Sequence, residues 1–192
     1  MASNEIGMKR AALAAFAAAY PLLAGAVDDT AQRKIDLIQH DAVPRGSVIV
    51  IGRDELNLYV RNQIAGTFRQ GIRGARLDLG YSRATGSAYI DFPSLRQAMG
   101  KPLGWPMSWL LAGERRVEVE AHLRCSAGRA VVNLDRVELS GLTIAGGALD
   151  YLIRNFVLPY YPDAAIGRPF RLEHHVERLE VRPGEVRVVI AK

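Results

Sequence analysis

The chain has 192 residues, of which 49% are hydrophobic and 23% are charged, and its formal net charge is +5. This composition is that of a globular protein and excludes a wholly disordered chain. The basic residues are scattered among acidic ones, without the dense basic stripe and accompanying aromatic residues of a nucleic-acid binder, so no nucleic-acid partner is expected.

The first 26 residues have the order of parts of a secretory signal peptide. Lys9 and Arg10 form a short positive region, residues 11–23 are apolar and rich in alanine, and residues 24–26 form a small-residue cleavage site. The apolar stretch is shorter than the ~20 residues of a spanning helix, so we expect cleavage, with an uncleaved membrane anchor as the alternative. The sequence thus predicts an exported protein of the periplasm or cell envelope, with residues 27–192 as a single domain.

Hydrophobic periodicity predicts helices that alternate with hairpins along this domain. The expected elements are a short helix within 28–46, a strand over 47–51, a helix over 55–65, a hairpin over 72–81 and 87–92, a helical turn over 94–99, a hairpin over 117–125 and 130–139, a helix over 148–161 and a closing hairpin over 172–181 and 185–190. Tight turns between paired strands mean antiparallel pairing. The predicted fold class is α+β, a curved antiparallel sheet built from hairpins with helices packed on one face.

Several local details belong to this prediction. Asp54 is expected to cap the helix over 55–65, and Thr85-Gly86 is expected to form the turn of the first hairpin. The second hairpin is expected to contain a bulge that keeps Val137 on the inner face. The helix over 148–161 is apolar nearly all round, which predicts burial on most sides or contact with an apolar partner.

No catalytic or metal-binding motif is specific enough to name a reaction. The segment around Ser82 lacks the second glycine of a nucleophile elbow and leads into a hairpin. His174 and His175 are adjacent, and in a strand their side chains would point to opposite faces, so they would not chelate one metal ion. The single cysteine, Cys125, is expected to be a buried, inert thiol. We therefore assign no cofactor, metal or catalytic residue, and a hydrolase that uses Ser82, His122 or His174 is the least favoured alternative.

Two segments carry more large apolar side chains than short elements need. Residues 101–113 include both tryptophans of the chain, Trp105 and Trp109, and residues 148–161 include Leu152, Phe156 and Tyr160. Packing into a core is one explanation. The other is that these side chains line a groove for an apolar ligand or contact a membrane interface, two roles that suit Trp and Tyr.

Four stretches of the domain resemble small exported bacterial proteins of unknown function. These proteins in turn resemble the LmeA/YpmS-type group, which is similar to tubular lipid-binding (TULIP-like) domains. The four stretches are a strand followed by D-E-L-N-L-Y-V (54–60), a mid-chain V-E-V-E hairpin (117–120), a glycine-rich approach to an apolar helix, and V-E-R-L-E-V-R-P-G-E-V-R-V-V-I (176–190). The resemblance covers most of the domain. It implies a long helix cradled by a curved antiparallel sheet, with an apolar groove for lipid.

The sequence therefore predicts an envelope protein that binds a lipid or another apolar small molecule non-covalently, in a groove between helices and sheet. A peripheral contact with the membrane is compatible with this function. The candidate groove residues are Leu56, Tyr59, Trp105, Trp109, Leu152, Phe156 and Tyr160, and the candidates for a headgroup are Arg61 and Arg154. The alternative is an interaction module that meets another envelope protein through an exposed apolar patch at residues 101–113.

Overall fold

The computed structural model describes residues 30–67, 71–98, 100, 104–105, 107–159, 161 and 165–192. The predicted signal peptide and Tyr160 lie outside these residues. In chain order the elements are α1 (Thr30–Gln39), β1 (Val48–Gly52), α2 (Arg53–Thr67), β2 (Ile72–Gly80), β3 (Arg83–Asp91), α3 (Phe92–Ala98), α4 (Met107–Leu110), β4 (Glu114–Ser126), β5 (Arg129–Leu139), β6 (Leu142–Thr143), α5 (Gly146–Leu152), the π-helix η2 (Ile153–Val157), β7 (Phe170–Arg171), β8 (Val176–Arg182) and β9 (Glu185–Ile190).

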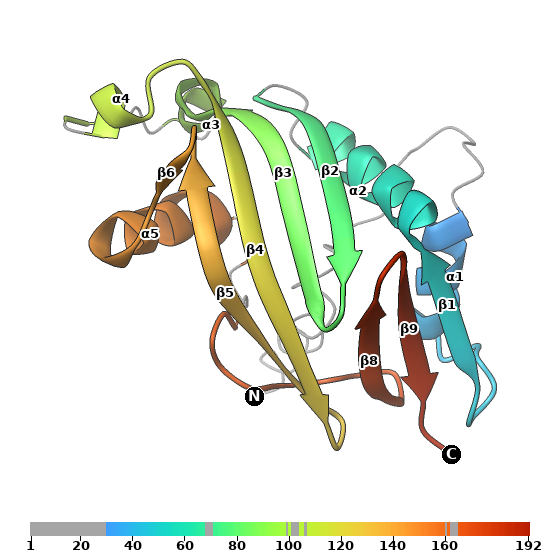
Figure 1. The fold of residues 1–192 in the computed structure, drawn as a ribbon. Coiled ribbons are helices and arrows are strands. Elements are labelled where there is room, and N and C mark those ends of the chain that lie inside the picture. The colour runs from blue at the N-terminus through green and yellow to red at the C-terminus, as the bar shows by residue number, and fades with distance from the viewer. Residues whose placement is uncertain are drawn as a thin grey trace, which may run out of the picture.

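The strands form two antiparallel sheets. The larger has the strand order β2-β3-β4-β5-β6, with β7 also paired to β5, and the smaller has the order β1-β9-β8. The long strands of the larger sheet curve, and α2, α3 and α5 lie on one side of it (Figure 1). The predicted α+β fold with a curved antiparallel sheet is thus confirmed.

Backbone hydrogen bonds join the two sheets at one end of the larger sheet. The Ser82 N–H, in the β2–β3 turn, donates to the Val181 carbonyl of β8 at 2.9 Å, and the Gly128 N–H, in the β4–β5 turn, donates to the Glu177 carbonyl at 3.0 Å. Strand β8 therefore lies against both hairpin turns (Figure 1).

The first hairpin turns earlier than the sequence predicts. Its turn is Tyr81-Ser82, so Thr85 and Gly86 lie within β3 and the predicted turn there is wrong. Ser82 adopts a left-handed backbone conformation with φ 53°, and its carbonyl accepts a hydrogen bond from the Leu123 N–H at 2.9 Å. Contacts with β4 and β8 fix the position of this turn. Local turn propensity does not include such contacts, so the sequence did not predict it.

The second predicted helix also begins earlier, at Arg53, so Asp54 lies within its first turn and is not the cap. The Gly52 N–H instead donates to a carboxylate oxygen of Glu55 at 2.8 Å. A glutamate at the third helical position that reaches back to the preceding N–H is one half of a capping box. The glutamate therefore takes the capping role that was predicted for Asp54.

The predicted bulge in the second hairpin is confirmed. Glu120 pairs with Arg136 and Ala121 pairs with Leu134, so Asp135 is an extra residue on β5. The extra residue shifts the alternation by one position, and Val137 therefore lies buried on the same side of the sheet as Leu134.

The predicted helix over 148–161 is α5, continued by η2, and it is less buried than the sequence predicts. Neither α5 nor η2 contains a fully buried residue. The apolar side chains of this helix pack on the sheet along one side and stay half-buried. The expectation that the helix is buried on most sides is therefore wrong.

Candidate apolar ligand site

The buried apolar residues form two separate clusters. The main core joins α1 and α2 to both sheets, and its buried part includes Leu56, Tyr59 and Leu123. A second cluster has at its centre Phe92, Leu111, Val137, Leu139 and Ile144. Half-buried apolar residues that pack against this second cluster are Ile90, Leu110, Val117, Val119, Leu134, Ala148, Leu149, Tyr151, Leu152 and Phe156.

The two clusters differ in how completely they are covered. Among the described residues the main core has 15 buried members and 9 half-buried ones, whereas the second cluster has 5 buried members and 10 half-buried ones. A half-buried side chain leaves part of its apolar surface in water, and that surface gains free energy when another apolar group covers it. The second cluster is therefore the candidate ligand site.

Strands β3, β4 and β5 provide the floor of the second cluster, and α3 and the α5–η2 helix cover parts of that floor (Figure 1). Alternation along β4 places Val117 and Val119 on the same face of the sheet. The rings of Phe92, from α3, and Phe156, from η2, meet edge to face with centroids 4.9 Å apart. This contact ties the π-helical turn to the end of the sheet where α3 lies.

A cationic side chain borders the apolar surface at the same place. The Arg96 guanidinium carbon lies 5.8 Å from the centroid of the Phe156 ring, which is the geometry of a cation–π contact. One of its terminal nitrogens donates to the side-chain oxygen of Asn155 at 3.4 Å, and the Asn155 amide donates to the Tyr151 carbonyl at 2.9 Å. Two residues of η2 thus hold the guanidinium at the edge of the second cluster.

The predicted groove residues do not all meet in one place. Leu152 and Phe156 belong to the second cluster. Leu56 and Tyr59 are 3% and 2% exposed within the main core, so they cannot line an open groove. They pack there because α2 turns this side toward α1 and the smaller sheet.

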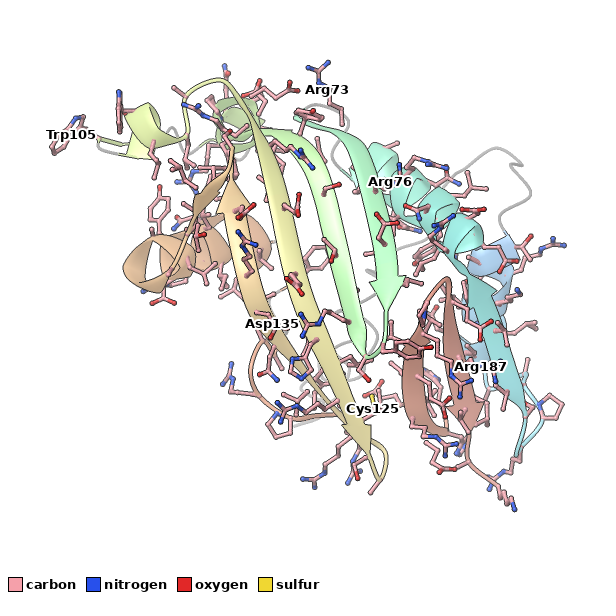
Figure 2. The ribbon with its side chains drawn as sticks, viewed as in Figure 1. Arg73, Arg76, Trp105, Cys125, Asp135 and Arg187 are labelled. Carbon is pink, nitrogen blue, oxygen red and sulfur yellow. The ribbon has the colours of Figure 1, made fainter. Side chains whose placement is uncertain are left out.

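The two tryptophans belong to neither cluster. Trp105 is 87% exposed and Trp109 is 77% exposed, and Trp105 projects away from the end of the molecule where α4 lies (Figure 2). Their predicted place in a groove is therefore wrong, because the described neighbours leave both rings in solvent. The predicted groove position of Tyr160 falls outside the described residues.

Neither of the two arginines predicted to bind a headgroup has its side chain directed to the second cluster by a contact among the described residues. Arg61 is exposed on α2, whose apolar side faces the main core. Arg154 is exposed and is engaged with Asp150, through an ion pair at 4.0 Å and a bond from its Nε to the Asp150 carbonyl at 3.3 Å. Arg96, which does lie at the edge of the second cluster, was not among the predicted residues. The sequence pattern that indicates it is its position one helical turn after Phe92.

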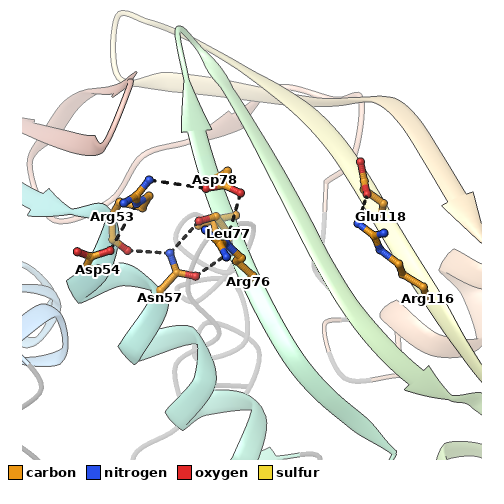
Figure 3. Close-up of polar contacts among 8 residues, drawn as sticks. All are labelled: Arg53, Asp54, Asn57, Arg76, Leu77, Asp78, Arg116 and Glu118. Carbon is orange, nitrogen blue, oxygen red and sulfur yellow. Dashed lines mark hydrogen bonds and ion pairs between the residues drawn. The ribbon is translucent and has the colours of Figure 1, made fainter.

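The E-L-N sequence at residues 55–57 has a structural role: it caps α2 and fixes this helix to the rest of the fold. Glu55 caps α2, and a hydrogen bond from Lys34 lowers the pKa of its carboxyl. Leu56 is buried in the main core. The Asn57 side chain donates to the Arg53 and Leu77 carbonyls at 2.9 and 2.8 Å and accepts from the Leu77 N–H at 2.7 Å (Figure 3). All three residues therefore position α2 against the sheets.

The other face of the larger sheet carries paired charges (Figure 2). Arg83 pairs with Glu120, and Arg116 pairs with Glu118 at 3.0 Å (Figure 3). His122 lies 3.1 Å from an Asp135 oxygen. This face therefore has the character of a solvated surface on which charges are mutually compensated.

No hydrogen bond among the described residues joins the side chains of Ser82, His122 and His174, although the Ser82 carbonyl accepts from the Leu123 N–H beside His122. Ser82 is in the β2–β3 turn and His122 is on the charged face. His174 and His175 lie in a turn with φ values of 55° and 56°, so their predicted place in a strand is wrong, and His174 lies 3.5 Å from Asp41. Within the described ranges, no group of three or more His, Cys, Asp or Glu residues has an arrangement that could hold a metal ion.

No helix among the described residues has both the length and the apolar character needed to cross a membrane. Comparison of the chain with protein-family models and with curated proteins finds no match. The resemblance to the LmeA/YpmS-type group thus remains a prediction from the sequence stretches that carry it.

Proposed function

We propose that the protein binds a lipid or a similar apolar molecule non-covalently at the second cluster. The observation that carries this proposal is the excess of half-buried over buried apolar side chains there, on a sheet face flanked by helices. A bound chain that covers ~100 Å² of this apolar surface gains about 2.5 kcal/mol from burial. The ligand would lie on Val117 and Val119 of the sheet and against Leu149, Leu152 and Phe156 of the helix.

We place this activity in the periplasm or cell envelope. Support comes from the order of charged, apolar and small residues in the first 26 positions. The resemblance to exported proteins of the LmeA/YpmS type supports the same location and the same ligand class.

The proposal is tested with protein purified from its own cell envelope. Native mass spectrometry and lipid extraction are expected to reveal a co-purifying lipid. After delipidation, the fluorescent fatty acid cis-parinaric acid should bind, and Leu152→Ser and Phe156→Ser should weaken its binding by about tenfold, since each removes a large apolar contact.

Leu37→Ser is the matched control for these substitutions. Leu37 is an exposed leucine, 48% accessible, on α1 and outside the second cluster, so its change should leave binding unaltered. Absence of both a co-purifying lipid and cis-parinaric acid binding would overturn the proposal.

A second candidate function is an interaction module of the envelope, and the exposure of Trp105 and Trp109 favours it. Exposed aromatic side chains are enriched at sites that meet partner proteins. Trp105→Asp should then abolish self-association or partner capture in light scattering and co-purification. An unchanged oligomeric state with unchanged partners would count against this function and leave ligand binding at the second cluster intact.

A further inference from the structure

Two arginines that border the second cluster each have a buried Nε–H without a hydrogen-bond partner among the described residues. They are Arg96 of α3 and Arg115 of β4. Folded proteins satisfy nearly all buried donors, because an N–H taken out of water without an acceptor is costly. The Nε–H of each guanidinium group therefore needs an acceptor that the described part of the chain does not supply.

Arg115 extends from the apolar face of β4. It pairs in register with Ile90 of β3 and precedes Val117 by two residues, so all three side chains lie on the same face. Ile90 and Val117 both pack against the second cluster. The adjacent Arg116 faces the opposite side of the sheet and pairs with Glu118.

Arg96 reaches the same end of the cluster from α3. Its guanidinium lies over the Phe156 ring, and Phe156 contacts the ring of Phe92, one helical turn before Arg96. Phe92 follows Ile90 by two residues, and Ile90 is the register partner of Arg115. The two arginines thus border the part of the second cluster where β3 passes into α3.

Asp91 and Glu114, the register partners next to the Ile90–Arg115 pair, are engaged elsewhere. Asp91 accepts hydrogen bonds from the backbone and hydroxyl of Ser94 at 3.1 and 2.6 Å. Glu114 pairs with Arg73 on the charged face. Among the described residues neither Arg96 nor Arg115 forms an ion pair with a carboxylate, so this end of the cluster keeps its positive charge.

We propose that Arg96 and Arg115 form the anion-binding end of the ligand site. The ligand is then an amphiphile with a carboxylate or phosphate headgroup at these arginines and an apolar chain on the second cluster. The Nε–H and a terminal N–H of a guanidinium point in parallel and match two oxygens of such a headgroup. This inference rests on the proposed function and adds the chemical class of the ligand.

The test compares an acid with its neutral ester in the full-length protein. Wild-type protein should bind cis-parinaric acid about tenfold or more tightly than cis-parinaric acid methyl ester, because only the acid offers an anionic group to the arginines. Arg96→Gln and Arg115→Gln should each reduce this preference, the ratio of the two affinities, by about tenfold. The ratio of the two affinities is measured on one protein sample, so it does not depend on how much of a variant is folded.

Arg116→Gln is the matched control, since this substitution removes a neighbouring charge from the opposite face of the same strand. It should leave the acid preference unaltered. Arg115→Lys, which retains the charge but lacks the guanidinium Nε–H, should show an intermediate preference.

Competition distinguishes the sources of the anion. Displacement of cis-parinaric acid by oleate points to a fatty acid, and tighter displacement by dioleoyl phosphatidic acid than by dioleoylglycerol points to a phospholipid. Displacement by inorganic phosphate as effective as by either amphiphile would overturn the amphiphile assignment.

Two other outcomes separate this inference from the proposed function. Equal binding of acid and ester by wild-type protein, or an unaltered preference in both Arg→Gln variants, would overturn the anion site and leave apolar binding standing. Failure of wild-type protein to bind both the acid and the ester, together with the absence of a co-purifying lipid, would overturn the proposed function and this inference with it.

Discussion

Asn57 is a buried polar side chain that closes one edge of the larger sheet. Strand β2 is the terminal strand there, so its backbone has no further strand to pair with on that side. The Asn57 amide offers both a donor and an acceptor, and it satisfies the N–H and the carbonyl of Leu77 (Figure 3). A single side chain thus fixes α2 to β2 and blunts an exposed edge.

We expect Asn57→Ala to lower the free energy of unfolding by about 2–4 kcal/mol, because it leaves the part-buried N–H and carbonyl of Leu77 without these partners. Urea denaturation measures this change. Arg61→Ala, at an exposed position of the same helix, should change the free energy of unfolding by less than about 0.5 kcal/mol. Equal effects of the two substitutions would contradict the role given to Asn57.

Glu55 makes stability depend on acid. Hydrogen bonds from Lys34 at 2.8 and 2.9 Å lower the pKa of its carboxyl in the folded protein. The unfolded chain therefore takes up a proton at higher pH than the folded one. The contribution of Glu55 is fully present above the ordinary glutamate pKa, about 4.3, and is lost as the pH falls through the lower folded-state value.

We expect Glu55→Gln to lower stability at pH 6 and to reduce the loss of stability between pH 6 and pH 3. The measurement is urea denaturation at both pH values. Asp54→Asn, at the exposed neighbouring carboxylate, should leave that loss close to the wild-type value. A wild-type pH dependence in Glu55→Gln would show that Lys34 does not stabilise the folded protein through this carboxylate.

At the scale of elements, the hairpin of β4 and β5 could be predicted with its bulge. The apolar residues of β5 alternate up to Leu134 and resume at Val137, three residues later, and this break requires the extra residue Asp135. The turn of the first hairpin could not, since Ser82 is held there by Leu123 and Val181, residues distant in the sequence. The apolar helix could be predicted, although it begins at Gly146 and ends at Val157, before the predicted end at residue 161. Its half-buried state could not be predicted. Periodicity records which residues are apolar and does not record how much of each is covered.

Leucines in the two clusters should respond differently to truncation. Leu56→Ala should cost about 3 kcal/mol of unfolding free energy, as expected for a cavity in a closed core. Leu152→Ala should cost about 1 kcal/mol or less, because its half-buried side chain is already partly in water in the folded protein. Thermal and urea unfolding of both variants measure the difference, and equal costs would mean that the second cluster is a closed core.

At the scale of the whole molecule, hairpins and helices were enough to predict a curved antiparallel sheet with helices on one face. They did not predict the division into two sheets and two clusters. That division follows from where β8 meets the hairpin turns, and Ser82 and Gly128 make these contacts through their backbone. Backbone contacts of this kind leave no trace in a hydrophobic pattern. The candidate site was located only in part, through Leu152 and Phe156.

Both tryptophans of the chain lie at the end of the molecule where α4 is located, so intrinsic fluorescence reports on that end alone. We expect long-wavelength emission that iodide quenches nearly completely, because both indole rings are exposed. Addition of anionic lipid vesicles should shift the emission to shorter wavelength if this end enters a membrane interface. Emission that iodide does not quench would contradict the exposure of Trp105 and Trp109.

Cys125 lies near the end of β4 and packs against the main core beside Leu179 of β8 (Figure 2). Burial raises the pKa of its thiol, so little of the reactive thiolate is present at neutral pH. Cys125 is half-buried, not fully buried as predicted, so alkylation in the closed molecule should be slower than that of an exposed cysteine and should become faster whenever β8 moves away. Because the chain has no other cysteine that competes for the reagent, the rate of labelling measures how often the two sheets separate.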